Sequence, residues 1–130
     1  MKPRYFHQTR PFPVPTEDGK TIGEHFGLVS TGDETISVAH MIAPPGWEEP
    51  HQTPEFDEYI LMVRGRKMVE IEEREIVLSA GESMRVGRGV RVRYSNPFDE
   101  IAEYWCVCLP AFSPDTVHRE TEDADGERRG

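Results

Sequence analysis

Residues 46–65 read GWEEPHQTPEFDEYILMVRG, and this run carries the clearest structural signal in the chain. It opens on a glycine and a proline-stiffened acidic segment, changes into the apolar stretch YILMV, and ends on Gly65. An apolar stretch of this length between turn residues predicts a β-strand. Because both of its faces are apolar, we expect a strand inside a sandwich or a barrel.

Similar short segments continue on both sides of this run. Turn residues separate them at intervals of about eight to twelve residues, and no segment keeps a helical apolar period for three turns. The expected strands lie within residues 20–29, 35–42, 66–72, 75–81, 82–86, 90–95 and 101–108. This pattern predicts an all-β domain, either a sandwich or a barrel.

The length of 130 residues leaves room for one domain with its own hydrophobic core. We expect an N-terminal arm at residues 1–19, which are rich in proline, and a β-barrel domain at residues 20–118. Residues 119–130 contain no apolar side chain larger than alanine, so we expect a disordered acidic tail there.

The charge balance argues against two classes of partner. Lysine and arginine total 15 against 24 acidic residues, which gives a formal net charge of -9. A negative field repels phosphate backbones and anionic headgroups, so we expect neither nucleic acid nor a membrane as a partner. The longest apolar run is YILMV, which predicts no signal peptide and no membrane span, and the cytoplasm is the expected location.

Cys106 and Cys108 are the only cysteines in the sequence. On a strand they would share one face, too splayed for a relaxed disulfide, and they lack the C-x-x-C spacing of redox sites. We expect two reduced thiols packed in the core, which favours a reducing compartment.

Residues 46–65 and the later stretch GESMRVGRGVRVRYSN, residues 81–96, together resemble the two signature motifs of the cupin superfamily. The first family motif runs glycine, five residues, His-x-His, three or four residues, glutamate, six residues and glycine. It is matched here by Gly46, four residues, His51-Gln52-Thr53, four residues, Glu58, six residues and Gly65. The second motif matches at every spacing from Gly81 to Asn96. The resemblance implies a double-stranded β-helix, or jelly-roll barrel, with a pocket inside it, commonly in a homodimer.

The resemblance also implies where a metal would bind, and there the match is incomplete. In metal-binding cupins the ligands are the two histidines and the glutamate of the first motif and the histidine of the second. Only His51 and Glu58 keep a ligand type, since Thr53 and Val92 stand at the other two positions. Zn, Fe or Mn normally needs three or four donors. We therefore expect no tightly bound cofactor, and a divalent metal only if a side chain such as Glu55 supplies a further ligand.

The residues expected inside the barrel follow from alternation along the strands. His51 and Thr53 would share one inward face, Glu58 would lie on the next, and Tyr94 would share the face of Val92. His51, Glu58 and Tyr94 are the candidate catalytic residues, and His51 with Glu58 is the candidate metal pair. The candidate ligand-binding residues are Trp47, Thr53, Glu55, Met62, Val92 and His40. The alternative is a structural hydrogen bond between His51 and Glu58, with Tyr94 packed in the core.

Four acidic residues surround His51 in the sequence, namely Glu48, Glu49, Glu55 and Asp57. If some of them line the mouth of a pocket, a cationic or polyhydroxylated ligand is favoured over an anion. A solvated acidic loop without a ligand is the alternative.

These residues leave three functions and one structural role open, and do not decide whether the protein is an enzyme. The favoured function is a binding protein that holds a small polar or cationic metabolite in the barrel, with a weak metal or none. A metal-free isomerase or epimerase would transfer protons with His51 and Tyr94 while Glu58 orients the substrate. A metal-dependent dioxygenase or lyase would use His51 and Glu58. A structural protein would instead fill the barrel with large side chains such as Met84 and Trp105.

Overall fold

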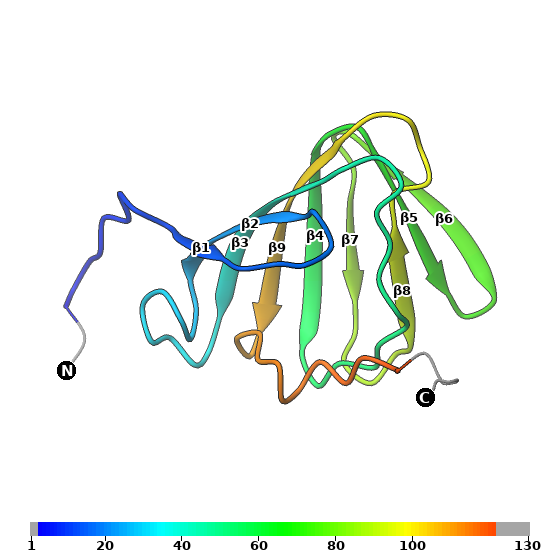
Figure 1. The fold of residues 1–130 in the computed structure, drawn as a ribbon. Helices are drawn as coiled ribbons and strands as arrows, with labels where there is room; N and C mark the ends of the chain where they lie inside the picture. The colour runs from blue at the N-terminus through cyan, green and yellow to red at the C-terminus, as the bar shows by residue number, and fades with distance from the viewer. Residues whose placement is uncertain (1–2, 122–130) are drawn as a thin grey trace.

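Nine β-strands in two antiparallel sheets make up residues 3–121, the part of the chain that the computed structural model describes (Figure 1). The strands are β1 (Phe12–Val14), β2 (Thr21–Phe26), β3 (Ser37–Ala43), β4 (Asp57–Arg64), β5 (Arg66–Ile71), β6 (Arg74–Ser79), β7 (Ser83–Val86), β8 (Val92–Ser95) and β9 (Ala102–Leu109). The larger sheet has the order β1-β2-β3-β9-β4-β7, and the smaller one has the order β6-β5-β8. No helix long and apolar enough to span a membrane occurs in these residues. Residues 122–130, most of the expected tail, lie outside the described part.

The last strand, β9, lies in the middle of the larger sheet. It pairs with β3, where Ala39 lies opposite Cys106, and with β4, where Ile60 lies opposite the same cysteine. Every strand pair in both sheets is antiparallel. Two antiparallel sheets that enclose one core form a sandwich of the jelly-roll type. The all-β, jelly-roll prediction is confirmed.

The hydrophobic core lies between the inward faces of the two sheets. Ile60 of β4, Val69 of β5 and Tyr104 of β9 are completely buried there. Alternate residues on each strand point the same way, which brings these side chains together from strands far apart in the sequence. Burying a side chain such as Ile60 or Val69 contributes roughly 1.5–3 kcal/mol.

β3 turns its small side chains toward the core. Ser37, Ala39 and Ala43 are buried, whereas Val38 and His40 lie on the opposite face and are half-buried. Small residues on an inward face leave volume that neighbouring side chains must fill or leave empty. The space between the sheets next to Ser37 and Ala39 remains open, and it forms part of the candidate site.

Two motif glycines turn the chain around β4 and β7. Gly65 follows β4 with a φ of 78°, and a Cβ built there would lie 2.1 Å from the carbonyl oxygen of Ile101. Gly81 precedes β7 with a φ of 86°, and an added Cβ would meet no atom within 4 Å. Positive φ values favour glycine because it has no Cβ. Gly65 is therefore required by both φ and close backbone approach, and Gly81 by φ alone.

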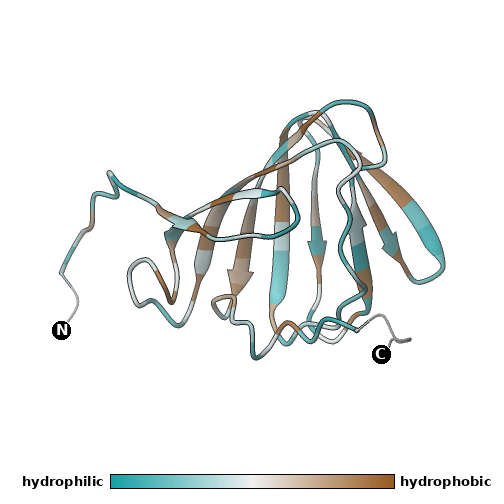
Figure 2. Cartoon of the chain, viewed as in Figure 1, coloured by the Kyte–Doolittle hydropathy of each residue, from teal (hydrophilic) through white to brown (hydrophobic). Residues whose placement is uncertain are grey.

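Part of the expected N-terminal arm joins the larger sheet. β1 pairs with β2, from Phe12 opposite Glu24 to Val14 opposite Ile22. The residues before β1 extend away from the sandwich (Figure 1). Hydrophilic residues also gather at the turn between β5 and β6, where that hairpin projects from the body of the molecule (Figure 2).

Candidate functional site

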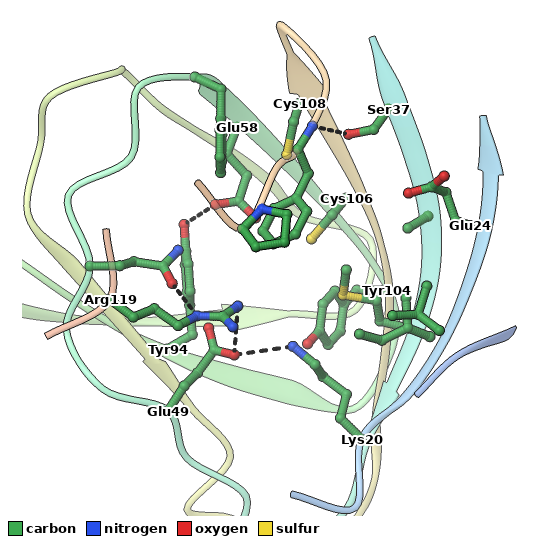
Figure 3. Close-up of a pocket in the computed structure, with 18 of the residues that line it drawn as sticks. Lys20, Glu24, Ser37, Glu49, Glu58, Tyr94, Tyr104, Cys106, Cys108 and Arg119 are labelled. Atoms are coloured by element: carbon green, nitrogen blue, oxygen red, sulfur yellow. Dashed lines mark hydrogen bonds and ion pairs between the residues drawn. The ribbon is translucent and has the colours of Figure 1, made fainter. Parts of the chain in front are cut away.

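A cavity of about 260 Å³ between the sheets is the candidate site (Figure 3). Its apolar lining residues are Val14, Ile22, Leu28, Val29, Ala39, Met41, Phe56, Cys106, Cys108, Phe112 and Pro114. Its polar lining residues are Lys20, Glu24, Ser37, Glu49, Gln52, Glu58, Lys67, Tyr94, Tyr104 and Arg119. A largely apolar wall with a few convergent polar groups is typical of small-molecule sites.

Ion pairs around Glu49 shape the mouth of this cavity. A wider cleft of about 840 Å³ shares seven lining residues with the cavity, so the two meet there. Oε2 of Glu49 lies 3.1 Å from Nζ of Lys20 and 3.6 Å from Nη2 of Arg119. Nε of Arg119 also donates a 3.2 Å hydrogen bond to Oε1 of Gln52. Three segments distant in sequence therefore meet at the mouth (Figure 3).

Arg119 belongs to the segment that the sequence predicts to be a disordered tail. The next residue, Glu120, donates its backbone N–H to the carbonyl oxygen of His51 at 2.8 Å, and its carboxylate pairs with Arg91. The start of the expected tail therefore packs against the segment before β4.

Glu58 and Tyr94, two of the three predicted catalytic residues, meet inside the cavity. The Tyr94 hydroxyl donates a 2.8 Å hydrogen bond to Oε1 of Glu58, and both residues are buried. Burial raises the pKa of Tyr94, and the negative charge of Glu58 raises it further. The phenol therefore stays protonated at neutral pH and acts as a donor to the carboxylate.

Lys67 is a buried cation that faces the cavity from β5. It shares the inward face of Val69 and is 2% exposed. Its Nζ lies 3.6 Å from the ring centroid of Tyr104 and 4.3 Å from that of Tyr94. Across residues 3–121 its ammonium group forms no hydrogen bond and no ion pair. Cation–π interactions with these aromatic rings are therefore the main contacts that stabilise its charge. Burial lowers the pKa of Lys67.

The hydroxyl of Tyr104 also lacks a partner. It is buried and forms no hydrogen bond with any described residue. Burial raises the pKa of Tyr104, so the hydroxyl remains a protonated donor. A buried donor without an acceptor costs about 1–3 kcal/mol. Two residues of the described cavity lining, Lys67 and Tyr104, thus carry a polar group that has no hydrogen-bond partner among the described residues.

Cys106 and Cys108 are free, buried and part of the cavity wall. Burial raises the pKa of both thiols, and the nearby carboxylate of Glu58 raises each of them further. Only a thiolate is an effective nucleophile or metal ligand. At neutral pH these thiols therefore contribute apolar, polarisable wall rather than chemistry.

The segment before β4 turns Gln52 inward and His51 outward. Gln52 is 3% exposed and lines the cavity, whereas the half-buried His51 and Thr53 are not among the described lining residues. The His51 ring lies near Arg91 and Glu120; burial lowers the pKa of His51, and Arg91 lowers it further. The expectation that His51 and Thr53 share the inward face was wrong by one residue.

The spacing of the first motif explains this correction. Five residues, not four, separate Gly46 from Gln52, and three residues separate Pro54 from Glu58. Gln52 and Pro54 therefore occupy the two histidine positions of the motif, and both are buried. The five-residue spacing of the family motif, counted from Gly46 without a deletion, would have identified Gln52 as the residue at the first histidine position.

Three predicted ligand-binding residues are core residues instead. Trp47, Met62 and Val92 are buried in the main hydrophobic cluster, apart from the described lining of the cavity. Nε1 of Trp47 donates a 2.7 Å hydrogen bond to Asp18, which holds the indole under the loop before β2. The indole is therefore a fixed part of the core.

His40 and Glu55, two further predicted ligand-binding residues, lie outside the cavity. His40 projects from the outer face of β3, with its Nε2 2.8 Å from Glu103 and its ring 5.0 Å from that of Trp105. Glu55 is exposed and pairs with His118. Neither side chain is placed to touch a ligand between the sheets.

The four acidic residues near His51 all have basic partners. The pairs are Glu48 with Arg93, Glu49 with Lys20, Glu55 with His118, and Asp57 with Arg88. Lysine or arginine is the partner in three of the four pairs, so their charges are compensated locally. The acidic field that would favour a cationic ligand is largely cancelled.

The residues at the motif's ligand positions do not fit a metal. With the corrected spacing they are Gln52, Pro54, Glu58 and Val92, which offer one carboxylate and one amide. Zn, Fe and Mn require three or four imidazole, carboxylate or thiolate donors. Among residues 3–121, no group of three or more His, Cys, Asp or Glu side chains is arranged to hold a metal ion. Of the predicted metal pair, only Glu58 reaches the cavity.

Sequence reasoning missed Lys67 and Tyr104. Alternate residues of a strand share one face, so Lys67 is expected on the face of Val69 and Ile71. In the same way Tyr104 is expected on the face of Cys106. The signal for both residues was present. Lys67 was missed because a charged residue on an alternating strand normally faces water.

A comparison with protein families matches the chain to the family described as Cupin domain, over residues 39–108. A curated relative from Myxococcus xanthus (strain DK1622), named Endoribonuclease YbeY, is 46% identical over 108 residues. That match covers 83% of this chain, but the chain spans only 37% of the relative's length. The name therefore describes a much longer protein.

Two solved structures share the fold at low sequence identity. The polyketide cyclase RemF from Streptomyces resistomycificus has a TM-score of 0.71 and 16% identity, covering 94% of this chain and 89% of that one. An RmlC-like cupin from Shewanella frigidimarina has a TM-score of 0.70 and 15% identity, covering 88% and 97%. At these identities the likeness concerns the fold alone.

Proposed function

The chain belongs to the cupin family, and we propose that its barrel binds a small organic molecule with an apolar body and an oxygen that accepts hydrogen bonds. The observation that carries this proposal is the unpartnered ammonium group of Lys67 in the cavity wall. The unpartnered hydroxyl of Tyr104 supports it.

The energetic argument is that both groups are costly without a partner. An unsatisfied buried donor costs about 1–3 kcal/mol, and more if it is charged. A carbonyl or carboxylate oxygen next to Lys67 would accept a hydrogen bond from its ammonium group, and Tyr104 is the second donor that we propose for it. The ligand would thereby recover free energy that the empty cavity has lost.

The charge argument favours such a ligand over a cation. Glu49 is paired with Lys20, and Glu58 accepts the hydroxyl of Tyr94. A cationic ligand would also meet the buried ammonium group of Lys67 in the cavity wall. This differs from the small polar or cationic metabolite that the sequence favoured, because the four acidic residues near His51 are paired with basic side chains.

The size of the cavity limits the ligand. Its volume of about 260 Å³ lies just below the range of roughly 300–1,000 Å³ that is usual for drug-sized ligands. We therefore propose a fragment-sized molecule, such as a bicyclic aromatic acid or ketone. Phe56 and Phe112 would pack against its apolar body.

A thermal-shift titration tests this proposal with two probes of equal shape. We expect 2-naphthoate to stabilise the protein, approaching about 2.7 kcal/mol at a hundred times its Kd. We expect 2-naphthylmethylammonium to have little effect. Lys67→Met should abolish the naphthoate shift, whereas Arg64→Met, which removes an exposed cation, should keep it. Equal stabilisation by both probes, or an unchanged shift in Lys67→Met, would contradict the proposal.

The enzyme alternatives draw less support from the geometry. An isomerase or epimerase needs His51 beside the substrate, and that imidazole lies near Arg91, outside the described lining. A dioxygenase or lyase with His51 and Glu58 as metal ligands meets the same difficulty. Of the three predicted catalytic residues, Tyr94 and Glu58 line the cavity, and they are hydrogen-bonded to each other.

We also propose that the protein forms a homodimer through the outer face of the larger sheet. Tyr59, Leu61 and Val63 project from this face of β4 and are 37%, 45% and 50% exposed. In register beside the first two lie Val107 and Trp105 of β9. A twofold dimer would place the same uncharged row of both copies in contact.

The proposed location is the cytoplasm. Its support is the pair of free thiols, Cys106 and Cys108, which are characteristic of a reducing compartment.

A further inference from the structure

We propose that Lys67 is a nucleophile that forms an imine with an aldehyde or ketone bound in the cavity. The inference rests on the proposed function, because the carbonyl group supplies the accepting oxygen described there. It adds a covalent step and names carbonyl compounds as the ligand class.

The contrast between two lysines in the described cavity wall supports this role. Lys20 is 7% exposed, and its amine is 3.1 Å from the carboxylate of Glu49. Lys67 is 2% exposed, and its amine touches aromatic faces instead. This ion pair occupies the Lys20 amine and holds it against Glu49, away from a ligand in the cavity. Within residues 3–121 nothing holds Lys67 in this way.

The environment of Lys67 also favours the reactive form of an amine. Only a neutral amine has the lone pair that attacks a carbonyl carbon. Burial lowers the pKa of Lys67 and so raises the neutral fraction at a given pH. Desolvation in an apolar pocket is a known way to activate lysine for Schiff-base chemistry.

The reaction is balanced without any further reactant. The Nζ lone pair forms a C–N bond to the carbonyl carbon, and the electrons of the C=O π bond move to oxygen. A proton passes from nitrogen to that oxygen and gives a carbinolamine. Loss of the hydroxyl group with the second nitrogen proton releases one water molecule and leaves the imine.

Tyr104 is the proposed hydrogen-bond donor to the departing oxygen. Its ring centroid lies 3.6 Å from Nζ of Lys67, and its protonated hydroxyl has no partner among the described residues. Donation to the carbinolamine oxygen would stabilise the charge that develops there. We therefore assign Tyr104 as a hydrogen-bond donor in this step and not as a base.

Reductive trapping tests the inference. The full chain is incubated with 2-naphthaldehyde and sodium cyanoborohydride, which reduces an imine to a stable secondary amine, and the adduct is located by peptide mass spectrometry. The sequence has only two other lysines, Lys2 and Lys20, which serve as internal references. Because burial lowers the pKa of Lys67 and so raises its neutral fraction, we expect Lys67 to be modified faster than either reference.

Variants and pH separate a chemical role from a structural one. Lys67→Arg keeps the cation but cannot form an imine, so it should lose the adduct, whereas Lys2→Arg, which removes a different lysine, should keep it. The rate of trapping at Lys67 should reach half its maximum below the pKa of an ordinary lysine, which is about 10.4. Tyr104→Phe should slow trapping more than it weakens the binding of 2-naphthoate.

The outcomes distinguish this inference from the proposed function. If 2-naphthoate stabilises the protein but Lys67 reacts no faster than Lys2, the imine inference is overturned and the binding proposal stands. If neither probe binds, both fail. Competition by 2-naphthoate against trapping at Lys67 is the result expected if both hold.

Discussion

The Tyr94 hydroxyl donates a 2.8 Å hydrogen bond to Oε1 of Glu58, across the cavity from one sheet to the other. Glu58 stands at the carboxylate position of the first motif, and Tyr94 follows the last ligand position of the second by two residues. In this chain the carboxylate is satisfied by a phenol of the same molecule. This hydrogen bond between residues of the two motifs therefore links the two sheets.

Removing this link should destabilise the fold. Tyr94→Phe leaves a buried carboxylate without its donor, which costs about 1–3 kcal/mol or more. Glu58→Gln should cost less, because an amide oxygen still accepts the hydroxyl. Urea unfolding of both variants measures the difference, with Tyr59→Phe on the outer face of β4 as the control. Equal losses in Tyr94→Phe and Tyr59→Phe would refute the role of the bond.

Lys67→Met should make the empty protein more stable at neutral pH. The folded-state pKa of Lys67 is lowered below the unfolded value of about 10.4. Between these two pKa values the unfolded state binds more protons, so wild-type stability rises with pH and the penalty is full below the folded-state pKa. The advantage of Lys67→Met should therefore be on the order of 1–3 kcal/mol at low pH and shrink as pH approaches 10.4. Denaturant unfolding at several pH values checks this, and an advantage that does not vary with pH would contradict it.

His51 and Gln52 should differ in their effect on binding. Gln52 lines the cavity and holds Arg119 at its mouth, whereas His51 lies outside the described lining. We expect His51→Ala to leave the 2-naphthoate titration unchanged and Gln52→Ala to weaken binding. Isothermal calorimetry measures both variants. A large loss in His51→Ala alone would restore the site that the sequence first favoured.

Substitution of the two motif glycines, Gly65 and Gly81, by alanine should destabilise the fold to different extents. Gly65→Ala forces both a strained φ and a clash with the carbonyl of Ile101, whereas Gly81→Ala meets only the strained φ. The left-handed conformation alone costs roughly 1–2 kcal/mol. Gly81→Ala should lose about that much, and Gly65→Ala clearly more. Thermal unfolding of the two proteins decides the question, and similar losses would argue against the close approach.

The proposed homodimer makes a prediction about the oligomeric state. Leu61→Glu places a charge in the exposed row of β4 and should convert the dimer to a monomer. Val77→Glu makes the same change at an exposed position of β6, in the smaller sheet, and should leave the dimer intact. Sedimentation velocity measures all three proteins. A wild-type monomer at micromolar concentration would reject the proposal.

The strands were predictable because the sequence alternates and turn residues separate the segments. The inside of the barrel was less predictable. The proline-rich segment before β4 is not a regular strand, so its alignment to the motif was wrong by one residue. His51 was therefore predicted to face the cavity in place of Gln52. Local alternation also could not reveal that Glu49 meets Lys20, because these residues are brought together only by the fold. Lysine side chains are usually exposed, but Lys67 is buried because it shares the inward face of β5 with Val69.

Arg119 comes after the last strand of either sheet, yet it forms part of the mouth through side-chain contacts with Glu49 and Gln52. Part of the entrance is therefore encoded after the strands that form the barrel core. Substitutions at Arg119 and its neighbours could change which molecules are admitted without disturbing the packing between the sheets. Arg119 is thus a position where a substitution can alter selectivity at little cost in stability.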